Sequence, residues 1–453
     1  MREHSKNFRK NWISIFFGGI GAQVLYVLVI NYSTIFFTDF LGISAGAAGT
    51  IFMLSRAWDA VNDPMCGALI EKFNPRFGKV QSFMFVGGLI ASISLVILFT
   101  VPNLSLVGRT IWGTVFYNMV GMAFTAVTVA VLLQLPRGSN DPDERVSFSI
   151  AYSVSCSIAG ILMGIAVGKL VVGFGQTDPA KGYQMTAVVS AVIGMVFILG
   201  SVLLFRDQAA EREASRKEKT KVLDMIKAVI HTPSFFAVVA GACIANMGLG
   251  IGGGGMIYYL TYYLHKPEWM AVILPVMYIG TLGGNFLAGA LSRFGKAKMI
   301  SVGLLMQAVG FVVRMVIGDS SIFVIGLFYF ISLAGCGMMQ TLINPCLTDC
   351  ADYAKYRTGT DCQAMTLTGS TLCSKMANGI GTAVLGFALQ IGGYDGTAAV
   401  QTEGAIQMIY NIHFWPVIIL SIIGAAILLL YKLDDDTMAE ARKALAAAEE
   451  EEV

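Results

Sequence analysis

The sequence QMTAVVSAVIGMVFILGSVLLF, at residues 184–205, contains no charged side chain. About 20 apolar residues in a helix are enough to cross the hydrocarbon core of a bilayer. Eleven further stretches are similarly apolar, namely 12–38, 45–73, 81–103, 108–136, 147–175, 234–264, 268–292, 299–317, 321–354, 362–392 and 408–431. Only 13% of the 453 residues are charged, whereas 55% are hydrophobic. The sequence therefore predicts an all-α integral membrane protein with twelve transmembrane helices.

The basic residues predict how the chain is threaded through the membrane. Cytoplasmic loops accumulate Lys and Arg, and most of the 31 basic residues lie in the two terminal tails and in every second loop. We therefore expect a multi-pass protein of the cell (inner) membrane with both termini in the cytoplasm. The first span lacks a small-residue cleavage site, so we expect it to be retained. The net charge of +2 does not indicate binding to nucleic acid.

A short motif occurs twice at matching places in the predicted topology. Arg76-Phe77-Gly78-Lys79 follows the second span, and Arg293-Phe294-Gly295-Lys296 follows the eighth. This repeat predicts two related six-helix halves that rock about a central site, which is the major-facilitator architecture. The expected parts are an N-terminal half, a charged cytoplasmic connector, a C-terminal half and a cytoplasmic tail, at 1–205, 206–233, 234–431 and 432–453. We expect the protein to be monomeric.

The second predicted span carries charges at membrane depth. Its polar residues follow helical spacing and share one face, namely Arg56, Asp59, Asn62 and Asp63. One acid at the bilayer centre costs about 2.5–3.5 kcal/mol, so two acids must face a polar interior and be neutralised. A structural ion pair with Arg56 is one explanation. Because two carboxylates exceed one arginine, we favour a coupling-cation site of Asp59, Asn62 and Asp63, whose oxygen atoms suit sodium or protons.

Motifs spread over nearly the whole chain form a specific set. They are Trp58-Asp59-Ala60-Val61-Asn62-Asp63-Pro64, the Arg76-Phe77-Gly78-Lys79 loop, Asp349-x-x-Asp352-Tyr353 followed by Thr358-Gly359, and Lys375 with Gly386 after it. Together they resemble the glycoside-pentoside-hexuronide:cation symporters, the melibiose carrier family. The resemblance implies a secondary transporter that uses sodium, lithium or protons to drive solute uptake. It also implies that Asp59, Asp63 and Thr125 bind the cation.

The resemblance further implies a buried lysine near the cation site, at Lys375. This residue lies in the middle of the eleventh predicted span, where an ammonium group needs an acid to offset it. We expect Asp59 or Asp63 to be that partner. Snorkelling of Lys375 to an interface is the alternative.

The residues expected at the solute site depart from the family. Galactoside carriers of the family use an acid in the first helix and another in the fourth, at the positions of Gln23 and Thr128. A supporting arginine corresponds to Ser153, and the aromatic platforms correspond to Leu132 and Gln340. Because neutral groups replace charged ones, we expect a different sugar, glycoside or uronide, or a less polar organic solute. The candidates for a polar cavity, each of which also suits an interhelical contact, are Gln23, Tyr26, Thr128, Ser153 and Gln340.

Further charged residues predict an inner gate. Asp349 and Asp352 end the tenth span at the expected cytoplasmic side, where we predict ion pairs to loop arginines such as Arg145. We expect no enzyme, because no nucleophile–base pair is recognisable outside the membrane, and no cofactor or metal beyond the coupling cation. The expected partners are a small solute, the cation and the lipid bilayer. A proton-coupled carrier of a non-sugar solute, and a transporter-derived channel or receptor, are the alternatives.

The glycine-rich sequence GLGIGGGG at residues 248–255 lies inside the seventh predicted span. It does not match a phosphate-binding loop, because no Lys-Ser or Lys-Thr follows it. Two explanations are open, a bending point near the substrate and close packing of helices.

Overall fold

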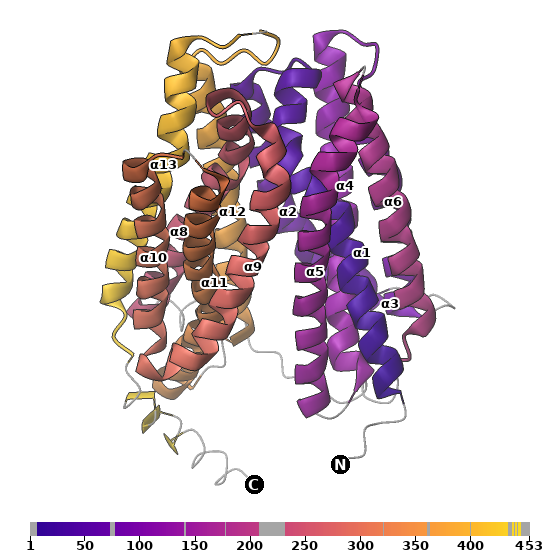
Figure 1. Ribbon diagram of the computed structural model, residues 1–453. Helices are drawn as coiled ribbons and strands as arrows, with labels where there is room; N and C mark the ends of the chain where they lie inside the picture. Colours follow the sequence, from indigo (N-terminus) through magenta and orange to yellow (C-terminus); the bar gives the residue numbers. More distant parts are fainter. Residues whose placement is uncertain are drawn as a thin grey trace. The chain divides into compact units, whose positions relative to one another are not determined.

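The computed structural model describes residues 7–72, 78–139, 142–176, 178–207, 232–319, 321–359, 363–398, 400–433, 437, 438, 440, 441, 443 and 444. Every regular element within these residues is helical (Figure 1), which agrees with the predicted class. The long helices are α1 (Phe8–Ile35), α2 (Ala45–Lys72), α3 (Lys79–Leu98), α4 (Leu106–Gly138), α5 (Pro142–Phe174), α6 (Pro179–Leu204), α8 (Pro233–Tyr258), α9 (Met270–Leu291), α10 (Lys296–Ile317), α11 (Ile322–Thr358), α12 (Gln363–Ile391) and α13 (Glu403–Ile427). The short helices are η1 (Phe36–Phe40), η2 (Tyr259–Tyr263), η3 (Pro267–Trp269), η4 (Ser292–Phe294) and η5 (Leu428–Leu430).

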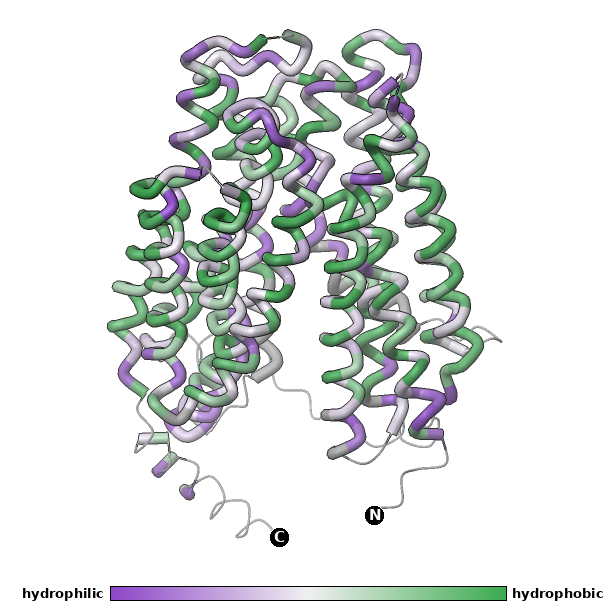
Figure 2. Tube along the Cα trace, in the orientation of Figure 1, coloured by the Kyte–Doolittle hydropathy of each residue, from purple (hydrophilic) through white to green (hydrophobic). Residues whose placement is uncertain are grey.

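Eleven helices of the described residues are long and apolar enough to cross a membrane. The sequence 184–205 lies almost entirely in one of them, α6, which is hydrophobic over most of its length (Figure 2). The long helix outside this group is α2, whose 28 residues include Arg56, Asp59 and Asp63. The charged residues that suggest a functional site thus also make α2 less apolar than the other long helices. A count of twelve membrane spans stays a prediction.

Several helices begin and end at residues whose chemistry explains the boundary. Asp178 caps α6 by accepting a hydrogen bond from the amide of Ala180 at 3.1 Å, and Pro179 occupies the first turn. The hydroxyl of Ser105 caps α4 in the same way. At the end of α11, Gly359 adopts the left-handed conformation with φ of 69°, which glycine accommodates without strain.

Two pairs of turns have matching backbone conformations. The glycines of the repeated motif, Gly78 and Gly295, precede α3 and α10 with φ of 93° and 100°. Likewise α1 and α8 each continue into a five-residue π-helix, η1 or η2. Each π-helix is followed by a residue of positive φ, which is 70° for Gly42 and 54° for His265. These shared turns support an internal repeat, which the sequence motif alone suggests only weakly.

The described residues form two compact units. The first lies within Met1–Arg216, Met256–Pro275 and Ala383–Ile409, and the second within Lys217–Gly255, Val276–Thr382 and Tyr410–Val453. In the first unit α1 packs against α5 and α6, and α2 packs against α4; in the second, α10 packs against α11. Because α8, α9, α12 and α13 contribute residues to both units, the units do not follow the predicted halves, which stay a prediction.

Glycine allows close contact between α8 and α12 in the second unit. A side chain at Gly250 would collide with the carbonyl oxygen of Asn378, and one at Gly381 would collide with the carbonyl oxygen of Met247. The α8 helix continues without a break through residues 248–255. Of the two explanations for this glycine-rich sequence, the structure favours helix packing.

Candidate functional site

The polar face of α2 is largely buried. Asp59 is 9% exposed and Asn62 is 3% exposed. The side chain of Arg56 is 16% exposed. The side chain of Asp63 lies outside the described part of the structure. Polar and charged groups at this depth need partners or a ligand, because removing them from water costs free energy.

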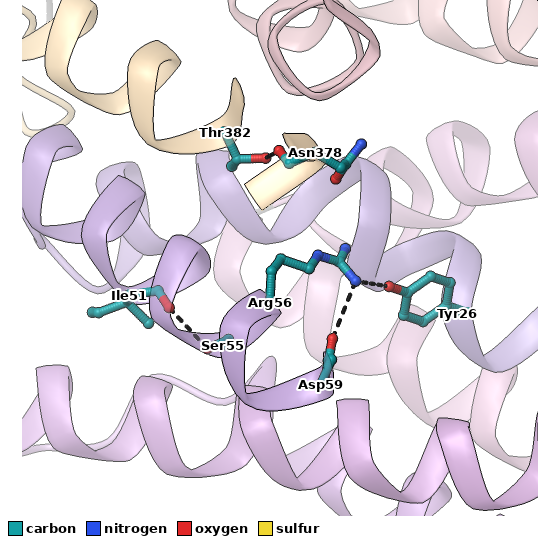
Figure 3. A network of polar contacts seen from close by, with 7 residues as sticks. All are labelled: Tyr26, Ile51, Ser55, Arg56, Asp59, Asn378 and Thr382. Atoms are coloured by element: carbon teal, nitrogen blue, oxygen red, sulfur yellow. Dashed lines mark hydrogen bonds and ion pairs between the residues drawn. The ribbon is translucent and has the colours of Figure 1, made fainter. Parts of the chain in front are cut away.

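Arg56 joins α1 to the carboxylate of Asp59 (Figure 3). Its Nη1 atom donates a hydrogen bond to the hydroxyl of Tyr26 at 2.8 Å and lies 3.4 Å from Oδ2 of Asp59. Charge-assisted hydrogen bonds usually measure about 2.7–2.9 Å, so Arg56 is held more closely by Tyr26 than by Asp59. The Tyr26 ring in turn stacks on Phe124 of α4, with ring centroids 3.9 Å apart. Tyr26 therefore fixes the position of the guanidinium.

A small cavity lies beside this ion pair. Its volume of about 10 Å³ is close to that of a single water molecule. Residues of α1, α2 and α4 line it, namely Tyr26, Val29, Ser55, Arg56, Asp59, Tyr117, Asn118 and Gly121. The cavity is large enough for one small ion and too small for a sugar.

Gly121 sets how closely α4 approaches the Asp59 carboxylate. A Cβ atom at Gly121 would lie 3.2 Å from Oδ1 of Asp59. Thr125 lies one turn further along the same face of α4 and is 8% exposed. The chain reverses direction from α2 to α3 and again from α3 to α4, so α2 and α4 run in the same direction. Thr125 is therefore displaced from Gly121 in the same direction as Asn62 is displaced from Asp59. The structure thus places Thr125 on the face of α4 that meets the polar face of α2.

The solute candidates have different surroundings. In the first unit the hydroxyl of Thr128 is buried without a hydrogen-bond partner among the described residues. Gln23 is partly buried, whereas Ser153 is exposed. Gln340 belongs to the second unit, where it is exposed and directs its amide nitrogen toward a cysteine sulfur at 3.3 Å. A cavity shared by all these residues stays a prediction.

The sequence model of one protein family, described as MFS/sugar transport protein, matches residues 14–435. The chain belongs to this family. It is similar to the isoprimeverose transporter of Lactiplantibacillus pentosus, with 28% identity over 90% of this chain and 85% of the relative. A putative glycoside/cation symporter of Escherichia coli (strain K12), YagG, is 26% identical over 88% of this chain and 86% of the relative.

Among solved structures, a bacterial homologue of the human lysosomal transporter Spinster has a TM-score of 0.71. It shares 14% sequence identity and covers 94% of this chain and 97% of its own. At that identity the likeness shows the fold alone. The protein is thus a multi-pass membrane transporter, a secondary transporter of a sugar-like solute and not an enzyme. The resemblance to cation symporters is confirmed at the level of the family, whereas the site residues stay predictions.

Two of the predicted inner-gate residues of this transporter, Asp349 and Arg145, have a partner within their own unit. Nζ of Lys296, at the start of α10, lies 2.5 Å from Oδ2 of Asp349. Arg145 lies in the first unit, where its Nε donates to the carbonyl oxygen of Ser139 at 2.9 Å. Asp352 belongs to the second unit, as Asp349 does. Ion pairs from Arg145 to either aspartate stay a prediction.

Lys375 lies near the middle of α12 and is partly buried, in the second unit. Its predicted pairing with Asp59 or Asp63 of the first unit is therefore not tested by the structure. Residues 76 and 77 of the repeated loop and residues 208–231 of the connector lie outside the described residues.

Several residues around the small cavity do not emerge from the sequence reasoning. Tyr26 is a solute candidate there, but in the structure it is the hydrogen-bond partner of Arg56. Asn118 and Gly121 line the cavity from α4. A signal for them does exist, since Asn118, Gly121 and Thr125 have the spacing i, i+3, i+7 and so form one polar or small face in an apolar helix.

A second buried arginine, Arg314, lies in the second unit. Its Nε lies 3.1 Å from Oδ1 of Asp319, and its Nη2 contacts Oδ2 of the same carboxylate. The guanidinium also lies 4.2 Å from the centre of the Tyr329 ring. Both charged side chains are 1% exposed. This two-point contact satisfies both charges, which is the arrangement of a structural ion pair.

Proposed function

We propose that this transporter is a symporter of a cation, Na⁺ or H⁺, and a sugar, glycoside or uronide, and that it works by alternating access. The cation is bound by oxygen atoms of Asp59, Asn62, Asp63 and Thr125. The observation that carries the proposal is the buried carboxylate of Asp59 beside a cavity of about 10 Å³. Carboxylate, amide and hydroxyl oxygen atoms are hard ligands, which suit a small hard cation.

The hydrogen bond between Tyr26 and Arg56 supports this role of Asp59. A carboxylate has about four acceptor positions, and the contact of Arg56 with one oxygen at 3.4 Å is long. The guanidinium offsets part of the negative charge of Asp59 without enclosing the carboxylate. A cation that enters adds a further positive charge beside this carboxylate.

Coupling follows from the position of the solute candidates. Thr128 lies on α4 about one turn after Thr125. Its buried hydroxyl has no hydrogen-bond partner among the described residues, which costs about 1–3 kcal/mol. A solute hydroxyl that bonds to Thr128 recovers this cost. We propose that Gln23, Tyr26, Ser153 and Gln340 complete the solute cavity. The names of the relatives, an isoprimeverose transporter and a glycoside/cation symporter, support a sugar-like solute.

We further propose that both termini face the cytoplasm, that α2 is the twelfth span, and that two six-helix halves rock about the site in the cell (inner) membrane. Lys375 balances the acids of α2 in one part of the cycle. Arg145, Asp349 and Asp352 close the inner gate. We propose a monomer as the functional unit.

Uptake by purified transporter in vesicles tests the proposal. A panel of glycosides and uronides is supplied with an inward sodium gradient, with a pH gradient, or with neither. We expect the cation gradient to stimulate uptake of one solute, and Asp59→Asn to abolish that stimulation. Asp178→Asn is the matched control, because asparagine also caps a helix and Asp178 lies outside the site. Stimulation that persists unchanged in Asp59→Asn would remove this residue from the mechanism.

Two alternatives give different results in the same vesicles. If protons alone are coupled to a non-sugar solute, the pH gradient drives uptake and sodium has no effect. A channel shows no counterflow, because counterflow of labelled solute requires a carrier whose site alternates between the two sides. Coupling is reciprocal at the level of binding affinity. If the cation raises the affinity for the solute by some factor, the solute must raise the affinity for the cation by the same factor.

A further inference from the structure

Asp39 lies in the π-helix η1, at the end of α1, and collects hydrogen bonds from distant parts of the first unit. The hydroxyl of Tyr394 donates to its Oδ1 atom at 2.5 Å, and the hydroxyl of Tyr262 donates to its Oδ2 atom. Thr38 donates to Oδ1 at 2.7 Å. Tyr262 belongs to η2 at the end of α8, and Tyr394 follows the end of α12. One carboxylate therefore ties together the ends of three helices.

The internal repeat explains why Asp39 and Tyr262 meet. Residues 36–42 read FFTDFLG and residues 259–265 read YLTYYLH, and each sequence forms a π-helix followed by a residue of positive φ. Aligned on Thr38 and Thr261, the two turns place Asp39 opposite Tyr262. Equivalent residues of two copies touch each other only where the copies meet at the axis that relates them. The Asp39–Tyr262 hydrogen bond therefore marks a contact between the two copies of the turn.

The surrounding residues hold this contact in place. The ring of Tyr394 packs edge-on against Tyr262 and Tyr258, with centroid distances of 5.4 Å and 5.2 Å. The hydroxyl of Tyr258 lies 3.0 Å from that of Thr38. Burial raises the pKa of Tyr394, as does the nearby charge of Asp39, so this hydroxyl keeps the proton that it donates. Gly396 completes the fit, because a Cβ atom there would lie 2.7 Å from Oδ1 of Asp39.

We propose that Asp39 is a positioning residue of the transport cycle, which holds the outer ends of α1, α8 and α12 together through Tyr262 and Tyr394. This inference rests on the proposed alternating-access function and orientation, in which the first span ends outside the cell. Residues 233–255 of α8 and 363–382 of α12 belong to the second unit, whereas their last turns belong to the first. Opening to the outside requires these last turns to leave α1, so the hydrogen bonds to Asp39 must break. The closed outer end is the state in which they are formed.

A cysteine at Val29 reports on this opening. Val29 lies on α1 about three turns below Asp39 and is 3% exposed, at the small cavity beside Arg56. Full-length Val29→Cys transporter in right-side-out vesicles is treated with a membrane-impermeant maleimide, without solute or cation gradient. The parent chain without this substitution gives the background from the native cysteines. The labelling rate then measures how often the outer end opens.

We expect Tyr262→Phe and Tyr394→Phe each to raise the labelling rate about tenfold, because each loses one hydrogen bond to a charged acceptor. Tyr263→Phe is the matched control, since this tyrosine belongs to the same π-helix and stacks on Tyr259. Gly396→Ala is also expected to raise the rate, because its Cβ atom would press on the carbonyl group of Thr38 and on the carboxylate of Asp39 without removing a donor. Unchanged labelling in both Tyr262→Phe and Tyr394→Phe, or an equal rise in Tyr263→Phe, overturns the proposal.

An exchange of the equivalent residues separates this role from a merely structural one. Asp39→Tyr and Tyr262→Asp should each raise the labelling rate, whereas the double variant should return it toward that of the parent, because it restores a carboxylate and a phenol at the contact. A double variant that labels as fast as the single variants contradicts the proposed pair. Labelling is read without coupling, so failure of the symport proposal in the uptake assay leaves this result interpretable, and the reverse also holds.

Discussion

Arg314 in the second unit and Arg56 in the first each lie against a buried aspartate, but the two pairs are built differently. Arg314 contacts both oxygens of Asp319, and both side chains are 1% exposed. Arg56 approaches one oxygen of Asp59 at 3.4 Å and directs its shorter bond, 2.8 Å, to Tyr26. The small cavity adjoins the pair of Arg56 and Asp59. A pair with a two-point contact serves the fold, whereas a carboxylate that Arg56 contacts at one oxygen beside a cavity is suited to a ligand that enters and leaves.

The largest expected effect concerns the pair of Arg314 and Asp319. Asp319→Asn leaves the buried guanidinium of Arg314 without its counter-charge, which should lower the free energy of unfolding by about 3–5 kcal/mol. Cation stimulation of uptake should persist in the folded fraction. Denaturant unfolding of the purified protein measures the first quantity, and the vesicle assay measures the second. Lost stimulation with intact stability would erase the distinction between the two pairs.

Asn62→Ala should separate binding from stability. The amide nitrogen of Asn62 is buried without a hydrogen-bond partner among the described residues, and its Oδ1 atom accepts a weak hydrogen bond from the thiol of Cys66 at 3.5 Å. Removal of the amide should therefore lower the free energy of unfolding by about 1 kcal/mol or less in the absence of cation. If the amide oxygen is a cation ligand, its loss should weaken cation affinity about 10–100-fold. Cation titration of thermal unfolding measures both effects. A less stable protein with unchanged cation affinity would assign Asn62 to the fold.

Gly121→Ala should narrow the small cavity. The added Cβ would lie 3.2 Å from Oδ1 of Asp59, which is tight enough that the carboxylate must shift. We expect cation affinity to fall about tenfold, at a cost near 1.4 kcal/mol. Gly173→Ala is the control, because no atom lies within 4 Å of a Cβ placed there. Equal behaviour of the two variants would show that the approach of α4 does not matter.

Tyr26→Phe should give the smallest effect. It should make the contact of Arg56 with Asp59 more like that of Arg314 with Asp319. Without the Tyr26 hydroxyl, Arg56 should move toward Asp59 and compete with the cation. The Phe124 stacking partner is retained. We expect apparent cation affinity to fall a few-fold, as for the loss of one modest hydrogen bond. Because we also place Tyr26 in the solute cavity, the KM for solute is measured in parallel at saturating cation, where a change reports the contact of Tyr26 with the solute.

The sequence predicts the helical class and most of the spans because long apolar stretches have few other solutions in a bilayer. The polar face of α2 is also predictable, since Asp59 and Asn62 follow helical spacing. The partner of Arg56 is not, because Tyr26 comes from another helix and only tertiary packing brings its hydroxyl within 2.8 Å. Asp39 is missed for a different reason. It lies at the edge of an apolar stretch, where an acid costs little free energy of membrane insertion and so draws no attention. The hydrogen bonds that it accepts become visible only once the structure places the ends of α8 and α12.

The contact of α8 with α12 has a mechanical consequence. At Gly250 and Gly381 each helix lies against a carbonyl oxygen of the other, with no side chain between them. Two helices in direct main-chain contact have no side chains between them that could adjust to a sliding movement. A relative shift would therefore make one main chain collide with the other. We therefore expect α8 and α12 to move together as one rigid body around Gly250 and Gly381. Whatever bending the transport cycle needs must be absorbed beyond these glycines, nearer to the last turns of the two helices.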